Sequence, residues 1–365
     1  MSKKTLSLGM LIAAGAWVAA CSKSEPKPEA NPAPTTAAPE EKKAVTIDRA
    51  MLVQFDKLPK VFDAKSNPLT AEKILLGKQL YFDKRLSKGQ DHSCNSCHGL
   101  DTYGVDNKKT SPGHRSQLGA RNSPTVLNAA GQFVQFWDGR AADVEAQALG
   151  PLTNPVEMAM TNDKSVLAVI NSMPDYVAAF KKAFPADVQP VNFVNLGKAI
   201  GAFERTLNTP APIDQYLSGD DSALSEQQKA GLAKFMDVGC TTCHSGNLFG
   251  GTTYQKLGLA VPWPDQKDLG RFDQTKAEVD KMMFKTPQLR NVAKTAPYYH
   301  DGSIATLSEA VKLMAKHQLG KTLSDEDTAN IVAFLESLTG TPQPDWAKEP
   351  ELPKSTAKTP KPDLK

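Results

Sequence analysis

The stretch of sequence that decides the fold is Cys94-Asn-Ser-Cys97-His98. Two cysteines that are separated by two residues and followed directly by a histidine form the attachment signature of a c-type haem. The two thiols bond covalently to the haem vinyl groups, and the adjacent histidine binds the iron as its fifth ligand. This stretch therefore predicts a covalent haem with His98 on one face of the iron.

A second copy of the signature lies at Cys240-Thr-Thr-Cys243-His244. Together the two copies use four of the five cysteines in the chain. One match of five residues can arise by chance, whereas two matches that take up nearly all the cysteines are hard to explain that way. We therefore predict two covalent haems, with His244 as the second axial histidine, and no disulfide bond.

The sequence around the two signatures looks duplicated. Thr70 and Ser225 each stand where a helix N-cap is expected, and an apolar helix then precedes the haem signature in both halves. Each half also ends in apolar residues at helical spacing, and strand patterns are nearly absent. We predict an all-α fold with two cytochrome c-type haem domains and long irregular loops, spanning 47–208 and 209–340.

The formal net charge of +3 comes from the two ends of the chain, because residues 47–340 carry 32 basic and 32 acidic side chains. The predicted domains therefore present no basic field for nucleic acid, and we exclude that class of partner. Residues 341–365 are rich in proline and lysine. We expect them to form a flexible tail, either loose or wrapped on the surface, with Trp346 as a local anchor.

The N-terminus predicts export. Residues 1–20 combine two lysines with an apolar run too short to span a bilayer comfortably, and small residues then precede Cys21. This pattern resembles a bacterial lipoprotein signal peptide, after which Cys21 is acylated and anchors the protein in a membrane. The alternative is an ordinary secretory peptide. Ser22, directly after the cysteine, favours sorting to the outer membrane. Residues 21–46 have the composition of a disordered tether. We therefore expect a periplasmic protein.

The sixth iron ligands decide whether the haems only carry electrons. His114 follows the first signature by sixteen residues, in a loop with several glycines that can fold back over the haem and move away. On spacing alone, an iron ligand and a surface histidine are equally good interpretations. For the second haem, Met314 and His317 lie three residues apart on one expected helix, and Met282 and Met283 are further candidates.

Five further stretches carry a family resemblance. They are 121–128 (RNSPTVLN), 136–141 (FWDGRA), 150–158 (GPLTNPVEM), 284–292 (FKTPQLRNV) and 295–302 (TAPYYHDG). With the two haem signatures, they make the chain resemble the bacterial di-haem cytochrome c peroxidases over nearly all of 60–338. The resemblance implies a periplasmic enzyme that reduces hydrogen peroxide with electrons from a cytochrome c or a blue-copper protein, and that works as a homodimer.

The resemblance also assigns site residues. It implies that His114 is the removable distal ligand of the peroxidatic haem and that Met314 is the distal ligand of the electron-accepting haem. Trp137 matches a tryptophan between the haems, and Glu157 matches the distal catalytic acid. The alternative roles are a core aromatic residue for Trp137 and a helix-capping or solvated carboxylate for Glu157. The related methylamine-dehydrogenase maturation enzymes have a tyrosine as the corresponding distal ligand. The methionine at position 314 therefore argues that the chain resembles the peroxidases rather than those enzymes.

A calcium site between the domains is also implied, with Asn122 and the backbone oxygens of Thr295 and Pro297 as ligands. Oxygen-only ligation suits calcium. Two other functions remain open at the level of sequence. One is a di-haem electron carrier without turnover, in which both irons stay six-coordinate. The other is a peroxide-dependent oxidase of a protein partner.

Overall fold

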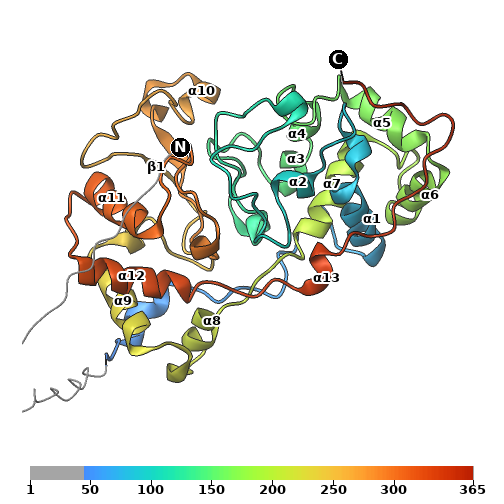
Figure 1. The fold of residues 1–365 in the computed structure, drawn as a ribbon. Helices are drawn as coiled ribbons and strands as arrows, with labels where there is room; N and C mark the ends of the chain where they lie inside the picture. The colour runs from blue at the N-terminus through green and yellow to red at the C-terminus, as the bar shows by residue number, and fades with distance from the viewer. Residues whose placement is uncertain (1–44, 365) are drawn as a thin grey trace, which may run out of the picture. The chain divides into compact units, whose positions relative to one another are not determined.

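The computed structural model describes residues 45–364, so the predicted signal peptide, Cys21 and most of the predicted tether lie outside the described residues. The described chain is mostly helical, which confirms the helical part of the fold prediction (Figure 1). Within 45–364, no helix combines the length and the apolar character that a membrane span requires.

The helices and strands follow the chain in this order. The helices of the first half are α1 (Ala71–Phe82), α2 (Cys94–Cys97), α3 (Val144–Gln147), α4 (Gly150–Thr153), α5 (Asp163–Asn171), α6 (Pro174–Ala183) and α7 (Phe193–Glu204). Those that follow are α8 (Pro212–Leu217), α9 (Glu226–Asp237), α10 (Phe272–Thr275), α11 (Leu307–Leu319), α12 (Asp325–Glu336) and α13 (Pro344–Ala347). Strands β1 (Tyr254–Lys256) and β2 (Met283–Lys285) pair antiparallel.

Both predicted N-caps are confirmed. The Thr70 hydroxyl accepts a hydrogen bond from the backbone N–H of Lys73 at 3.2 Å, where α1 begins. The Ser225 hydroxyl accepts one from the backbone N–H of Gln228 at 3.2 Å, where α9 begins. Each cap satisfies an N–H group that has no partner inside its helix, and so fixes where the helix before each haem signature starts.

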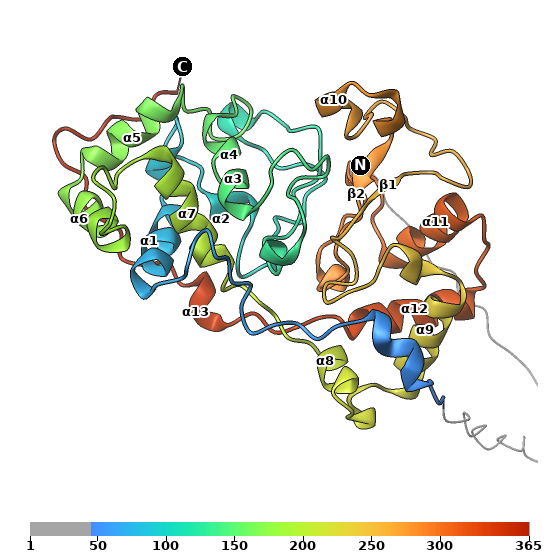
Figure 2. The same ribbon diagram turned by 180° about the vertical axis from the view of Figure 1, so that it is seen from behind.

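A matching helix pair supports each haem signature. Helix α1 packs against α7, and α9 packs against α12 (Figures 1 and 2). A glycine lies at each crossing: a Cβ added to Gly77 would collide with the backbone oxygen of Ala199, and one added to Gly231 would collide with that of Asn330. The absence of a side chain therefore lets the two backbones approach closely at equivalent places in the two halves.

The buried apolar residues form two main clusters. The first, which we call the first core, draws on α1 and α4–α7 and includes Trp346 from the tail. The second core draws on α8, α9 and α12. It also includes Ile47, Leu52 and Phe55 from the start of the described chain, although the sequence placed them with the first half. The N-terminal segment packs there because Phe55 stacks on Phe249 at 4.6 Å between ring centroids.

The C-terminal tail lies along the first half of the molecule. Both views show it leaving α12, passing α13 and continuing to the C-terminus beside α5 (Figures 1 and 2). Side chains of the first half hold its backbone, since the Arg85 guanidinium donates to the oxygen of Pro353 at 2.7 Å and the Gln90 amide donates to that of Pro360 at 2.8 Å. The tail thus follows the surface-wrapped alternative, with Trp346 buried.

Candidate haem sites and the boundary between them

The first haem signature occupies one wall of a cavity, which we call the first cavity. Helix α2 carries Cys94 and Cys97, and His98 follows directly at its C-terminal end. The His98 Nδ1 lies 3.3 Å from the backbone oxygen of Gly104. Burial lowers the pKa of His98, which favours the neutral ring. A neutral imidazole whose Nδ1–H is bound to a carbonyl presents Nε2 as a ligand for iron.

The second signature has the same arrangement in a second cavity. Cys240 belongs to a short 3₁₀ helix, η6 (Cys240–Thr242), with Cys243 and His244 directly after it. The His244 Nδ1 lies 3.0 Å from the backbone oxygen of Phe249, and burial lowers the pKa of His244 to about 4. In both cavities the donor set of two thiols and one oriented, neutral imidazole fits a c-type haem.

The structure separates the four candidates for the distal ligand of the second cavity. Met314, on α11, lines this cavity. Within the described residues His317 is not part of this lining, and its ring packs 5.0 Å from that of Trp263. Met282 and Met283 are not part of the lining within the described residues. Met314 is therefore the candidate that shares a cavity with His244.

The lining of the first cavity includes the half-buried carboxyl of Glu157. The Asn154 side-chain amide donates to Glu157 Oε1 at 2.7 Å, which leaves Oε2 for another partner. Burial raises the pKa of Glu157, against the opposing charge of Arg140 and the hydrogen bond from Asn154. A carboxyl of raised pKa in a cavity beside a haem signature is able to accept and return a proton.

His114 lies next to Glu157 through its backbone. Its N–H donates to the backbone oxygen of Glu157 at 2.8 Å, and its side chain is 5% exposed. In the described chain the lining of the first cavity includes Gly113 and Glu157 but not His114. Gly113 is required for close approach, since an added Cβ would collide with the backbone oxygen of Val156. Arg115 has a positive φ of 57°, so the backbone turns sharply here.

Three residues line both cavities: Trp137, Lys285 and His300. The Trp137 indole N–H donates to the backbone oxygen of Asn122 at 2.9 Å, and its ring lies 6.4 Å from that of His300. Trp137 therefore contributes a wall to the cavity of each haem signature. Sequence reasoning missed Lys285, although this residue stands in one of the stretches that carried the resemblance.

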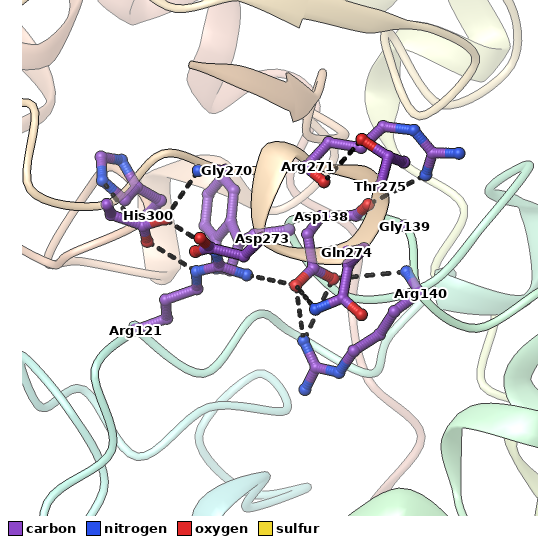
Figure 3. Close-up of polar contacts among 12 residues, drawn as sticks. Arg121, Asp138, Gly139, Arg140, Gly270, Arg271, Asp273, Gln274, Thr275 and His300 are labelled. Atoms are coloured by element: carbon purple, nitrogen blue, oxygen red, sulfur yellow. Dashed lines mark hydrogen bonds and ion pairs between the residues drawn. The ribbon is translucent and has the colours of Figure 1, made fainter. Parts of the chain in front are cut away.

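An ion-pair network joins the two halves at the rim of the first cavity (Figure 3). Arg121 is its centre, with Nη1 2.7 Å from Asp138 Oδ2 and Nε 2.6 Å from Asp268 Oδ2. Arg140 and Gln274 contact Asp138 as well, at 3.1 Å and 3.3 Å. Since Asp268 and Gln274 come from the second half, the network connects segments that are more than a hundred residues apart in sequence.

The predicted calcium ligand Asn122 contacts the segment that follows Thr295 and Pro297. The Asn122 backbone N–H donates to the oxygen of His300 at 2.8 Å, so Asn122 lies beside the loop that holds Thr295 and Pro297. The Asn122 amide donates to the oxygen of Lys108 at 2.9 Å, which leaves its Oδ1 as an acceptor. No group of three His, Cys, Asp or Glu side chains in residues 45–364 is arranged to hold a metal. A calcium ion here would depend on amide and carbonyl oxygens.

Comparison with known proteins agrees with this geometry. The family model of the di-haem cytochrome c peroxidases matches residues 71–222. A cytochrome c551 peroxidase of Pseudomonas aeruginosa is 49% identical over 315 residues, covering 84% of this chain and 90% of that protein. One of Nitrosomonas europaea is 46% identical over 296 residues, covering 80% and 87%.

Among solved structures, a MauG-like protein associated with microbial copper homeostasis is 28% identical and superposes with a TM-score of 0.68, covering 80% of this chain and 95% of that one. The sequence relatives extend across both haem signatures and the segments between them. The chain therefore belongs to the di-haem cytochrome c peroxidase family, whose members are peroxidase-type oxidoreductases.

Proposed function

We propose that this enzyme reduces hydrogen peroxide to two waters in the first cavity, with two electrons that enter at the second. The family implies two c-type haems. Cys94, Cys97 and His98 would hold one of them, and Cys240, Cys243, His244 and Met314 would hold the other. When bound, the haems supply the iron that binds peroxide and the redox steps. The observation that carries the proposal is the half-buried carboxyl of Glu157 in the cavity of the first haem signature.

Glu157 moves the proton in this scheme. Its Oε1 is held by Asn154, and its Oε2 takes a proton from one peroxide oxygen and returns it to the oxygen that leaves as water. Two electrons and two protons complete the conversion of one peroxide into two waters. Trp137 lines both cavities and so provides an aromatic side chain on the route between them.

His114 is the gate in this proposal. Its imidazole would hold the iron of the first haem in the oxidised resting enzyme, and it would leave that iron once the other haem is reduced. The hydrogen bond from the His114 backbone N–H to the backbone oxygen of Glu157 links this loop to the segment that carries the catalytic carboxyl, and the sharp turn at Arg115 supports a loop with two arrangements. The buried position of the His114 ring outside the cavity lining suits the released arrangement.

A His114→Gly variant tests the gate. It should reduce peroxide without prior reduction, because no imidazole then closes the iron. An Arg115→Gly variant is the matched control, since it loosens the same turn but keeps the imidazole, and it should still require reduction. Peroxide turnover is measured with reduced cytochrome c, with and without half-reduction beforehand. An equal requirement for reduction in His114→Gly and in the natural enzyme would exclude the gate.

The remaining assignments are proposed on the same basis. The electron donor is a small periplasmic cytochrome c or blue-copper protein, and the working form is a homodimer with calcium bound by Asn122, Thr295 and Pro297. The two haem domains are divided near residue 209, between the first core and the second. The protein is exported to the periplasm and is anchored to the outer membrane through acylated Cys21.

Removal of calcium with a chelator, followed by gel filtration and a turnover assay, tests the calcium and dimer assignments together.

A further inference from the structure

Lys285 is a buried lysine at the boundary between the two cavities. It ends β2 opposite Tyr254, and only 4% of it is exposed. Its backbone N–H donates to the oxygen of Trp137 at 2.8 Å, so its position is tied to that of the tryptophan. Lysine is seldom fully buried without a charged partner, because moving an ammonium group out of water is costly.

Among residues 45–364, the ammonium group of Lys285 has no charged hydrogen-bond partner. Its hydrogen-bond acceptor is the neutral side-chain oxygen of Gln132, and no carboxylate of residues 45–364 lies within ion-pair distance of it. Asp138 is the charged group whose field reaches it, but the carboxylate of Asp138 is already bound by Arg121 and Arg140. Burial lowers the pKa of Lys285 to about 7, with Asp138 acting in the opposite direction.

The position of Gln132 shows where the ammonium group points. Gln132 lines the first cavity and is not part of the lining of the second. The end of the Lys285 side chain is therefore held at the first cavity. An ammonium group has three N–H donors, and one hydrogen bond to Gln132 leaves two of them for a further acceptor. The groups that suit them best are anionic oxygens inside that cavity.

We propose that Lys285 binds a haem carboxylate in the first cavity and, by its positive charge, raises the reduction potential of that haem. The proposal rests on the proposed function only in assuming a haem at Cys94 and Cys97. A c-type haem keeps its two carboxylate side chains free when the thiols attach to its vinyl groups. A cation beside the haem favours the ferrous state, since that state carries one positive charge less. Lys285 is a positioning residue in this role.

The test is a potentiometric titration of the Lys285→Met variant, with the two haems followed separately by electron paramagnetic resonance. We expect the midpoint potential of the first haem to fall and that of the second to stay unchanged. Lys285→Arg should keep the natural potential, because it keeps the charge. Lys256→Met is the matched control, since Lys256 is exposed on the neighbouring strand β1. Both haems of this variant should have the midpoint potentials of the natural protein. Unchanged potentials in Lys285→Met, or a shift at the second haem alone, would overturn the proposal.

A second measurement separates this proposal from the proposed function. Haem content per chain is measured first, and fewer than two haems in the natural protein would contradict the proposed function. A protein with two haems but no peroxide turnover would also contradict that function. The midpoint potentials of the haems would then still test the role of Lys285. If Lys285→Met does not fold, resonance Raman spectra of the natural protein and Lys285→Arg are compared in the carboxylate bending region. A shifted band of the first haem supports the contact, and identical spectra overturn it.

Discussion

At the scale of single residues, two carboxyls line the first cavity, one buried and one half-buried, and they differ in their partners. Glu157 has Asn154 on one oxygen and the charge of Arg140 nearby, and its pKa is raised. Glu204 is 4% exposed at the end of α7, and burial and the charge of Glu145 raise its pKa to about 8 against the opposing charge of Arg205.

Replacing Glu157 by Gln should lower peroxide turnover by about 10² to 10⁴-fold, because the amide cannot take a proton from peroxide. In the natural enzyme, turnover should rise with pH as Glu157 loses its proton, and this rise should lie above the ordinary carboxyl range because its pKa is raised. Steady-state rates at several pH values check both effects. Glu336→Gln, at an exposed site on α12, should behave as the natural enzyme. Full turnover in Glu157→Gln would remove this residue from the mechanism.

Glu204 makes a separate prediction about stability. Its pKa in the folded state lies above the ordinary 4.5, so the folded protein binds this proton more tightly than the unfolded chain. The free energy of unfolding should therefore fall as the pH rises from about 4.5 towards 8, by at most about 1.4 kcal/mol per pH unit. Glu204→Gln should remove this part of the pH dependence and be the more stable protein at pH 8.

Urea unfolding at pH 5, 6.5 and 8 measures the effect of Glu204→Gln. Glu72→Gln serves as the control, because Glu72 is exposed on α1, the helix that packs against α7. If the free energy of unfolding of Glu204→Gln depends on pH in the same way as that of the natural protein, the Glu204 carboxyl is ionised without cost in the folded protein.

At the scale of elements, the C-terminal tail acts as a strap on the first half. Helix α13 inserts Trp346 into the first core, where it is 7% exposed. Further along, the Thr356 hydroxyl donates to the oxygen of Ser172 at 2.8 Å, and the backbone N–H of Asp363 donates to the oxygen of Lys88 at 2.9 Å. The Lys88 N–H in turn donates to the oxygen of Met158, next to Glu157. The strap therefore supports the backbone beside the candidate catalytic carboxyl.

Trp346→Ala should lower the free energy of unfolding by about 3 kcal/mol, because it leaves a large cavity in the first core. Chemical denaturation followed by the haem absorbance measures this loss. Leu364→Ala removes a side chain that is 68% exposed on the same strap and should change stability little. If both variants unfold at the same urea concentration as the natural protein, Trp346 does not anchor the strap.

At the scale of the whole molecule, the Arg121 network holds the two halves together beside the first cavity (Figure 3). Burial works to raise the pKa of Asp268, but the hydrogen bond and charge of Arg121 outweigh it and keep the pKa below 3.8. A depressed pKa means that the folded state favours the ionised carboxyl. The contribution to stability is therefore present at neutral pH and is lost as the pH falls through the folded pKa.

Arg121→Met should cost about 3 kcal/mol, since it leaves two partly or fully buried aspartates without their main cation. It should also speed hydrogen exchange in residues 264–280, because the network attaches this segment to the first half. Lys267→Met changes a lysine in the same segment that is 93% exposed, and it should leave both measurements unchanged. Equal exchange in the two variants would mean that the network does not hold the segment.

The sequence by itself determined the parts of this protein that depend on local chemistry. The two haem signatures and the caps at Thr70 and Ser225 could be predicted because each needs particular residue types at a fixed spacing along a few residues. The family also followed from the sequence, because the matching stretches are long. Trp137 and Glu157 could be named only through that resemblance, since a tryptophan or a glutamate in a loop has no local signal of function.

The tertiary structure decided everything that depends on residues far apart in the chain. Only the fold places Lys285 and His300 beside Trp137, and only the fold joins Arg121 to Asp268, 147 residues later. It also distinguishes Met314 from His317, three residues away on the same helix, because Met314 lines the second cavity and His317 packs against Trp263 instead. Burial, charge pairing and cavity lining are set by the packing of distant segments, and no short stretch of sequence contains that information.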